Sequence, residues 1–313
     1  MRLRHPSGRT VHIGCEVTPE PTRKLPTLIT QLDTYAAARI IIGADSLGVN
    51  LWLPPALAAA VAGGLRARTR LRAELDARRL EVVTLSGLSF DEGEASAAVE
   101  GGSENHEPGW DEPARLDYTL DLARILIDLM PDESVRGTVG TIGLGRRAGH
   151  DEATEKASAG ILRRLSAGLA DLAWQNGRAV RVGFHTTDGY AVDGANDTVA
   201  ALTRVDKDRL GVRLDLDHVS RTWPDPAAGI DMLSDAGLSI TEVRLTAAPG
   251  PDPGRRRAAL ARLLGPDGPQ TEYVTLAAHV PDPSAKQVAA GVTYVLEELA
   301  TLGLAPENEP CPA

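Results

Sequence analysis

The sequence is poor in aromatic residues and in cysteine, and it has no long apolar run. Phe, Trp and Tyr make up 4% of its 313 residues, so a hydrophobic core must be built from Ala, Leu, Val and Ile. A disulfide bridge between the two cysteines, Cys15 and Cys311, is possible but is not expected. We expect both thiols to be reduced, as is typical of proteins in the reducing cytoplasm. No apolar run approaches the roughly 20 residues that span a bilayer. The basic N-terminal segment lacks the continuous apolar stretch of a signal peptide.

The sequence also lacks an excess of basic charge. It has 43 acidic residues against 33 basic ones, a formal net charge of −10, and no basic block. This balance argues against a nucleic-acid groove and against attraction to anionic lipid. We therefore expect a cytoplasmic protein whose partners include neither nucleic acid nor a membrane.

What the sequence does contain is a regular alternation of short β-branched runs with long Ala/Leu/Arg segments of helical period. Eight strand–helix units in about 300 residues predict a (β/α)8 TIM barrel. We expect a single barrel domain over residues 1–305 and a flexible tail over 306–313. A doubly wound open sheet is the alternative, because alternation alone does not show closure. The predicted strands cover residues 10–17, 48–54, 80–89, 136–145, 179–189, 210–220, 240–248 and 272–280.

The sixth predicted strand ends on a cluster of potential metal ligands, Asp215, Asp217 and His218. Period two puts both aspartates on one side of the strand, where carboxylates in an apolar interior need an ion partner, water or a cation. His218, three residues after Asp215, can share an ion with it, and Asp and His are ligands for Zn, Mn or Fe. The alternative is that one aspartate pairs with Arg213 or Arg244 while His218 faces solvent.

The other predicted strand ends add polar side chains to the same face, which is where a barrel builds its chemistry. These residues are Glu16, Trp52, Ser86, Ser89, His185, Asp188, Arg244, Thr246 and His279. The glycine-rich stretch 137–147 lacks the Gly-Lys-Ser/Thr ending of a P-loop, so it predicts a tight turn rather than phosphate binding.

Several separate segments resemble, in order, the EboE-type metabolite traffic proteins. They are MRLRHPSGRTVHIG, LRAELDARRLEVVTLSG, PARLDYTLDLARILIDLMPD, GRAVRVGF and DRLGVRLDLDHVS, all within residues 1–250. That group belongs to the xylose isomerase-like TIM-barrel superfamily, with sugar-phosphate isomerases, epimerases and endonuclease IV. The resemblance implies a small polar metabolite as partner, namely a sugar, a sugar phosphate or a cyclitol. It also implies a divalent metal held by acids and imidazoles from several strand ends.

The metal-site pattern implied by this resemblance is only partly present. Asp215 and His218 match the Asp-x-x-His of strand six. Strand five of EboE-type proteins typically ends in Glu-Pro-Glu-Pro-Gly-Cys, whereas residues 185–190 read His-Thr-Thr-Asp-Gly-Tyr. Arg244 stands where a His, Lys or Gln is usual, and a cation there repels a metal. Strand eight offers His279 in place of a glutamate.

The first functional hypothesis is a metal-assisted isomerase or epimerase. The ion, Zn, Mn or Fe, would act as a Lewis acid and template. Its predicted ligands are Asp215, His218 and His185. The predicted catalytic side chains are His185, Asp188 and His279. The predicted substrate contacts are Glu16, Trp52 and Arg244, of which Arg244 would bind an anionic group.

Two further hypotheses stay open on the same barrel. One is a metabolite-binding or traffic protein with an eroded metal site, in which Arg244 fills the vacated space. The other is a metal-free enzyme with His185 and Asp215 as the proton-transfer pair.

Overall fold

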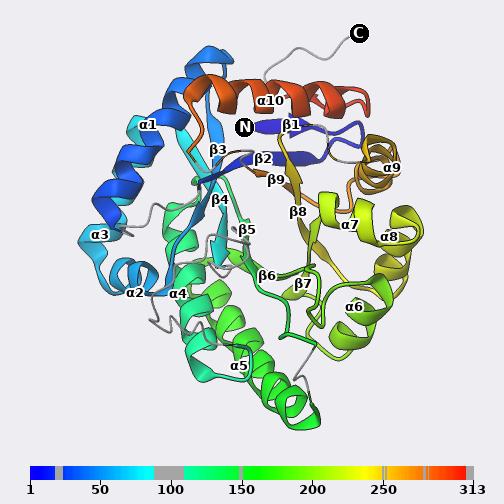
Figure 1. Ribbon diagram of the computed structural model, residues 1–313. Coiled ribbons are helices and arrows are strands. Elements are labelled where there is room, and N and C mark those ends of the chain that lie inside the picture. The colour runs from blue at the N-terminus through cyan, green and yellow to red at the C-terminus, as the bar shows by residue number, and fades with distance from the viewer. Residues whose placement is uncertain are drawn as a thin grey trace, which may run out of the picture.

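The chain forms a closed barrel of parallel strands. The computed structural model describes residues 1–17, 24–87, 109–147, 151–248, 250, 252–277, 280 and 282–307. Within them the strand order is β10-β1-β2-β3-β4-β5-β6-β7-β8-β9, and β2 also pairs with β9. Every pairing from β2 around to β9 and back to β2 is parallel. This closure confirms the predicted (β/α)8 barrel and excludes the open sheet (Figure 1).

The barrel strands match the predicted runs, but most of them end earlier. They are β2 (Thr10–Val17), β3 (Leu47–Trp52), β4 (Leu80–Gly87), β5 (Arg136–Thr141), β6 (Ala179–His185), β7 (Leu210–Asp215), β8 (Ile240–Thr246) and β9 (Tyr273–Ala277). Outside the barrel, β1 (Arg2–Arg4) joins β2 and β10 (Ala305–Pro306), both antiparallel. Because the Glu307 N–H also donates to the Arg2 carbonyl, the described chain stays paired beyond the predicted start of the tail.

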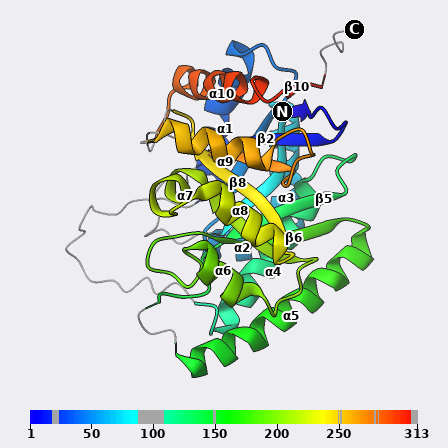
Figure 2. The ribbon, with the colours of Figure 1, turned by 90° about the vertical axis from the view of Figure 1, so that its right-hand side faces the viewer.

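The helices lie around the outside of the strands (Figures 1 and 2). They are α1 (Leu25–Ile41), α2 (Pro55–Gly63), α3 (Leu65–Ala77), α4 (Pro113–Leu129), α5 (Glu152–Asn176), α6 (Ala195–Leu202), α7 (Leu216–Thr222), α8 (Pro226–Asp235), α9 (Pro253–Leu263) and α10 (Ala285–Ala300). Of these, α2, α4, α8 and α9 begin with proline and α1 has proline as its second residue, which suits the first helical turn because no N–H is needed there. Among the described helices, none combines the length and the apolar character that crossing a membrane requires.

The apolar core lies between the strands and the helices, whereas the inside of the barrel is polar. Asn50 of β3 donates a hydrogen bond of 3.2 Å to Glu242 of β8, and these strands are not neighbours in the sheet. Both side chains must therefore point into the barrel. Thr84 is the register partner of Asn50, so it points the same way, and Asn50 also donates to its hydroxyl at 2.9 Å. The alternating residues, such as Leu85, face outward into the apolar core.

Glycine makes room for a large side chain in this interior. Arg213 is completely buried on β7. A Cβ on Gly140 of β5 would lie 2.7 Å from the Arg213 Cδ atom, closer than carbon atoms approach. The glycine-rich β5 therefore admits the arginine stem into the barrel, where a branched side chain is usual.

Candidate functional site

A chain of buried ion pairs crosses the barrel. Arg213 Nε lies 3.2 Å from Glu242 Oε2, and Arg213 Nη2 lies 3.5 Å from Glu16 Oε1. Arg213 and Glu242 are register partners on β7 and β8, and both are 0% exposed. Charges this far from water are tolerated only when they are paired, so these residues depend on one another.

Arg244 extends this chain toward the carboxyl ends of the strands. Its Nε and Nη2 atoms lie 3.2 and 3.0 Å from Glu16 Oε2, and its Nη1 atom lies 2.7 Å from Asp215 Oδ2. One guanidinium on β8 thus joins carboxylates from β2 and β7. Burial alone would lower the pKa of Arg244, but the two carboxylates outweigh burial and raise it above its usual range. The Arg244 charge is therefore permanent.

Asp215 is held by α7 as well as by Arg244. Its Oδ1 atom accepts the backbone N–H groups of Asp217 at 3.1 Å and of His218 at 3.0 Å, so Asp215 caps the helix N-terminus. Burial opposes ionisation of this carboxyl group, but Arg244, His185 and the N–H of His218 together lower its pKa to about 2. Asp215 therefore stays an anion over the whole physiological range.

The two aspartates of the sixth predicted strand do not share a side, and that prediction was wrong. The chain leaves the strand at Asp215 and enters α7 at Leu216, so the strand period no longer applies. Asp217 instead accepts a hydrogen bond of 2.7 Å from the Thr246 backbone N–H and lies 3.3 Å from the Arg256 guanidinium. It fixes α7 to β8 and α9.

His218 also turns to another partner. Its Nε2 atom lies 2.9 Å from Asp193 Oδ1 and 3.3 Å from the Thr222 hydroxyl. Asp193 in turn lies 3.6 Å from the Arg147 guanidinium. The His218 imidazole therefore contacts Asp193, whereas it was predicted to share an ion with Asp215. Asp193 lies in the loop after β6, and the strand pattern gave no signal for it.

His185, at the end of β6, lies beside the ion-pair chain. Its Nε2 atom lies 3.9 Å from Asp215 Oδ2, beyond hydrogen-bond distance. Its Nδ1 atom is buried and has no hydrogen-bond partner among the described residues. Burial, and then the Arg213 charge, lower the pKa of His185 well below its usual value. The ring is neutral at physiological pH and can accept a proton.

The donor set does not fit a metal ion as it stands. Among the described residues, no group of three or more His, Cys, Asp and Glu side chains is arranged to hold one. Asp215 is engaged by α7 and Arg244, and His218 by Asp193. The Zn, Mn or Fe site of Asp215, His218 and His185 stays a prediction; in the described residues a guanidinium contacts Asp215, and His218 contacts Asp193.

The remaining predicted residues have different positions. Trp52, 5% exposed, ends β3 beside its register partner Ser86. Asp188 is exposed in the turn after β6, and within the described chain it has no ion pair to the buried network. His279 lies outside the described residues. Glu242 was not among the predicted residues, although Glu242 and Arg244 alternate in β8 just as Arg213 and Asp215 do in β7.

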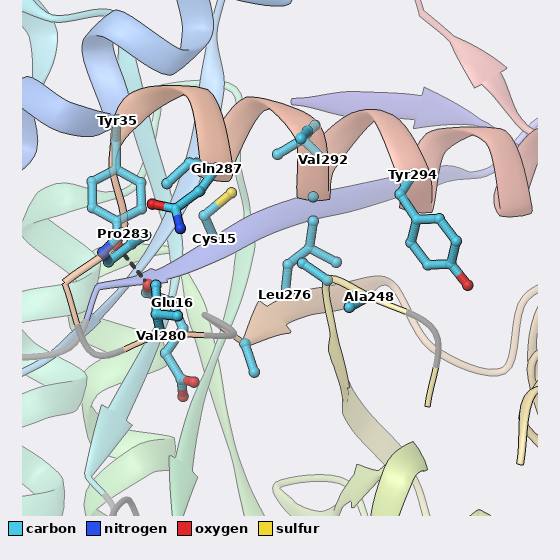
Figure 3. A pocket seen from close by; sticks show the side chains of 15 residues that line it. Cys15, Glu16, Tyr35, Ala248, Leu276, Val280, Pro283, Gln287, Val292 and Tyr294 are labelled. Carbon is cyan, nitrogen blue, oxygen red and sulfur yellow. Dashed lines mark hydrogen bonds between the residues drawn. The ribbon is translucent and has the colours of Figure 1, made fainter. Parts of the chain in front are cut away.

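A separate cavity lies outside the barrel wall. Its volume is about 330 Å³, and it lies between β2, β9 and α10, with lining residues that include Cys15, Leu276 and Val292. Cys15 points toward α10, whereas the Glu16 carboxylate points away from it (Figure 3). Burial raises the pKa of the Cys15 thiol to about 12, so the thiol is unreactive. We therefore place the candidate site at the ion-pair chain and not in this mostly apolar cavity.

The low pKa of Asp215 predicts how stability depends on pH. A carboxyl group whose pKa falls from 3.8 to about 2 on folding stabilises the folded state by about 2 kcal/mol above pH 4, and this contribution is lost as the pH falls toward 2. We expect Asp215→Asn to lower the free energy of unfolding at pH 7, with a smaller difference from the wild type at pH 2.5. Urea titrations at both pH values measure this, and an equal difference at both would contradict it.

The comparisons with known proteins extend these observations. No family model matches the sequence, and no curated protein does. The structure is similar to a putative sugar phosphate isomerase/epimerase from Anabaena variabilis, with 13% identity, coverage of 94% of this chain and 100% of that chain, and a TM-score of 0.62. It is also similar to D-allulose 3-epimerase from Methylomonas sp., with 14% identity, coverage of 92% and 98%, and a TM-score of 0.60.

A third similar structure is a xylose isomerase domain protein from Planctomyces limnophilus. It has 12% identity, coverage of 94% of this chain and 97% of that chain, and a TM-score of 0.55. The likeness covers nearly the whole barrel in all three cases. At such identities it shows the fold alone, a TIM barrel like those of these structures.

Proposed function

We propose that the chain acts on a small neutral polyhydroxy metabolite, a sugar or a cyclitol, at the carboxyl ends of its barrel strands. One observation carries the proposal: Glu16, His185, Asp215 and Arg244, from four different strands, converge at that end of a closed barrel. TIM-barrel enzymes build their active sites there. A similar structure described as a D-allulose 3-epimerase supports a sugar as substrate, and another is described as a putative sugar phosphate isomerase/epimerase.

The proposed chemistry is transfer of a proton by His185. Its neutral imidazole can remove a proton from a carbon beside a carbonyl group and return it. Arg244 uses three of its five N–H donors on Glu16 and Asp215, and its side chain is 26% exposed. The remaining donors could stabilise negative charge that develops on a substrate oxygen. Asp215 orients Arg244 and is not the base, because Arg244 and two backbone N–H groups already occupy its two oxygen atoms.

A neutral substrate is favoured over a phosphorylated one by the charges of the site. The buried network has three carboxylates (Glu16, Asp215, Glu242) and two guanidinium groups (Arg213, Arg244), and each guanidinium contacts carboxylates. In this network a phosphate group would meet no guanidinium that is free of carboxylate contacts. The network has one more carboxylate than guanidinium groups, so it would repel a dianion.

Calorimetric titration of the full chain with a panel of neutral ketoses, aldoses and cyclitols, each beside its monophosphate, tests the proposal. We expect at least one neutral compound to bind about tenfold or more tightly than its phosphate, a difference of about 1.4 kcal/mol. Tighter binding of the phosphate would contradict the assignment of a neutral substrate. Binding of no compound would contradict the proposed function itself.

A second candidate function is a non-catalytic traffic protein of the EboE type. The favouring observation is that Asp215 is fully engaged, which leaves His185 as the single candidate base among the side chains of the network. Such a protein would bind the metabolite without exchanging its protons. Incubation of the bound sugar in D₂O, followed by mass spectrometry, separates the two functions, because only the enzyme incorporates deuterium.

A further inference from the structure

We propose that the Arg244 guanidinium serves as a built-in cation, filling a place where the surrounding side chains would otherwise bind a divalent metal ion. The inference goes beyond the proposed function, because it concerns which group supplies the positive charge of the site. It does not depend on the identity of the substrate. It implies that the site works without a metal and keeps its properties in the presence of a chelator.

The geometry around Arg244 supports this inference. Glu16 from β2 and Asp215 from β7 contact different edges of the guanidinium, at 3.0 and 2.7 Å. His185 from β6 lies on the Asp215 side, with its Nε2 atom 3.9 Å from the same Oδ2 atom that Arg244 contacts. Two carboxylates and one imidazole form a donor set that Mn²⁺, Fe²⁺ or Zn²⁺ accepts. These three side chains come from three different strands, and the arginine lies among them.

The guanidinium and a metal ion exclude each other at this position. A metal bound to Asp215 Oδ2 at about 2.1 Å would lie against the Arg244 Nη1 atom, which is itself 2.7 Å from that oxygen. Asp215 Oδ1 offers no alternative, because it accepts two backbone N–H groups at the start of α7. The planar fork of arginine satisfies two carboxylates at once, so the cation is supplied by the chain itself.

Removal of the guanidinium should therefore uncover a metal site. In Arg244→Ala, the carboxylates of Glu16 and Asp215 lose their shared cation and face a vacated space beside His185. We expect this variant to bind one Mn²⁺ per chain, at least 100-fold more tightly than the wild type, and to melt at a higher temperature with Mn²⁺ than without it. The double variant Arg244→Ala/Asp215→Asn should lose this Mn²⁺ binding. In Arg244→Lys, which keeps a positive charge, Mn²⁺ binding should stay as weak as in the wild type.

The experiment is Mn²⁺ titration of the full chain by calorimetry and electron paramagnetic resonance, with thermal melts in parallel. The wild type is titrated first, and stoichiometric Mn²⁺ uptake by the wild type that Asp215→Asn abolishes would overturn the inference. A folded Arg244→Ala protein that binds no Mn²⁺ would overturn it too, as would a variant that stays unfolded both with and without Mn²⁺. Sugar binding is not a readout here, so either outcome leaves the proposed function to its own test.

Discussion

Replacing Arg213 by methionine is expected to lower the free energy of unfolding by about 3–5 kcal/mol. Methionine fills much of the space of the arginine stem, but it leaves the Glu242 carboxylate without its ion partner at a position that is 0% exposed. Burial already raises the pKa of Glu242 in spite of Arg213, so this carboxyl group is costly to ionise. Removing the guanidinium turns a compensated charge into an uncompensated one.

Two further variants make this prediction specific to the buried pair. Arg124 of α4 pairs with Asp121 at 2.7 Å on the surface, where its side chain is 50% exposed. Arg124→Met should cost less than about 1 kcal/mol, as exposed ion pairs do. The double variant Arg213→Met/Glu242→Leu removes both buried charges and should recover most of the lost stability. Urea denaturation at pH 7 measures all of them, and an Arg213→Met protein as stable as Arg124→Met would refute the dependence of the barrel on this pair.

The second large effect is expected on the proposed chemistry. His185→Asn should slow incorporation of solvent deuterium into the bound sugar by about 10²- to 10⁴-fold, since asparagine cannot accept the proton. The affinity for the sugar should change less than threefold, because the ion-pair chain of Glu16, Asp215 and Arg244 is made without His185. The rate of exchange in D₂O and the calorimetric affinity separate these two effects.

His12→Asn provides the matched control for this substitution. His12 lies near the start of β2, at the opposite end of the barrel, where its ring stacks on Tyr273 with centroids 5.5 Å apart. The same chemical change there should leave deuterium exchange at the wild-type rate. Equal losses in both variants would indicate general damage to the barrel and would argue against His185 as the base. Unchanged exchange in His185→Asn would remove it from the mechanism.

A good part of the fold could be predicted from the sequence. Periodicity is a local property, so eight apolar runs followed by helical segments indicate eight strand–helix units wherever the chain folds. The ends of the strands were harder to predict. The run 210–220 continues in apolar and polar alternation past Asp215, but the carboxylate caps α7 and the strand stops there. The cap, rather than the apolar pattern, decides where β7 ends.

The sequence predicted the residues of the candidate site better than it predicted the contacts between them. Glu16, His185, Asp215 and Arg244 were all expected at strand ends, and the structure brings these four together. His218 and Asp217 were expected to join them, yet each has a closer partner, Asp193 and Arg256 respectively. Those partners are 25 and 39 residues distant in sequence, and no local pattern connects them.

The sequence by itself determined the eight strand–helix units, and it determined that charged side chains stand near the strand ends. Only the tertiary structure decided that Arg244 lies between Glu16 and Asp215, where metal ligands were expected to meet. The physical reason is that alternation tells which side of a strand a residue faces but not which side chain it meets. That choice is made when β9 closes on β2, which brings side chains 228 residues apart within 3.0 Å.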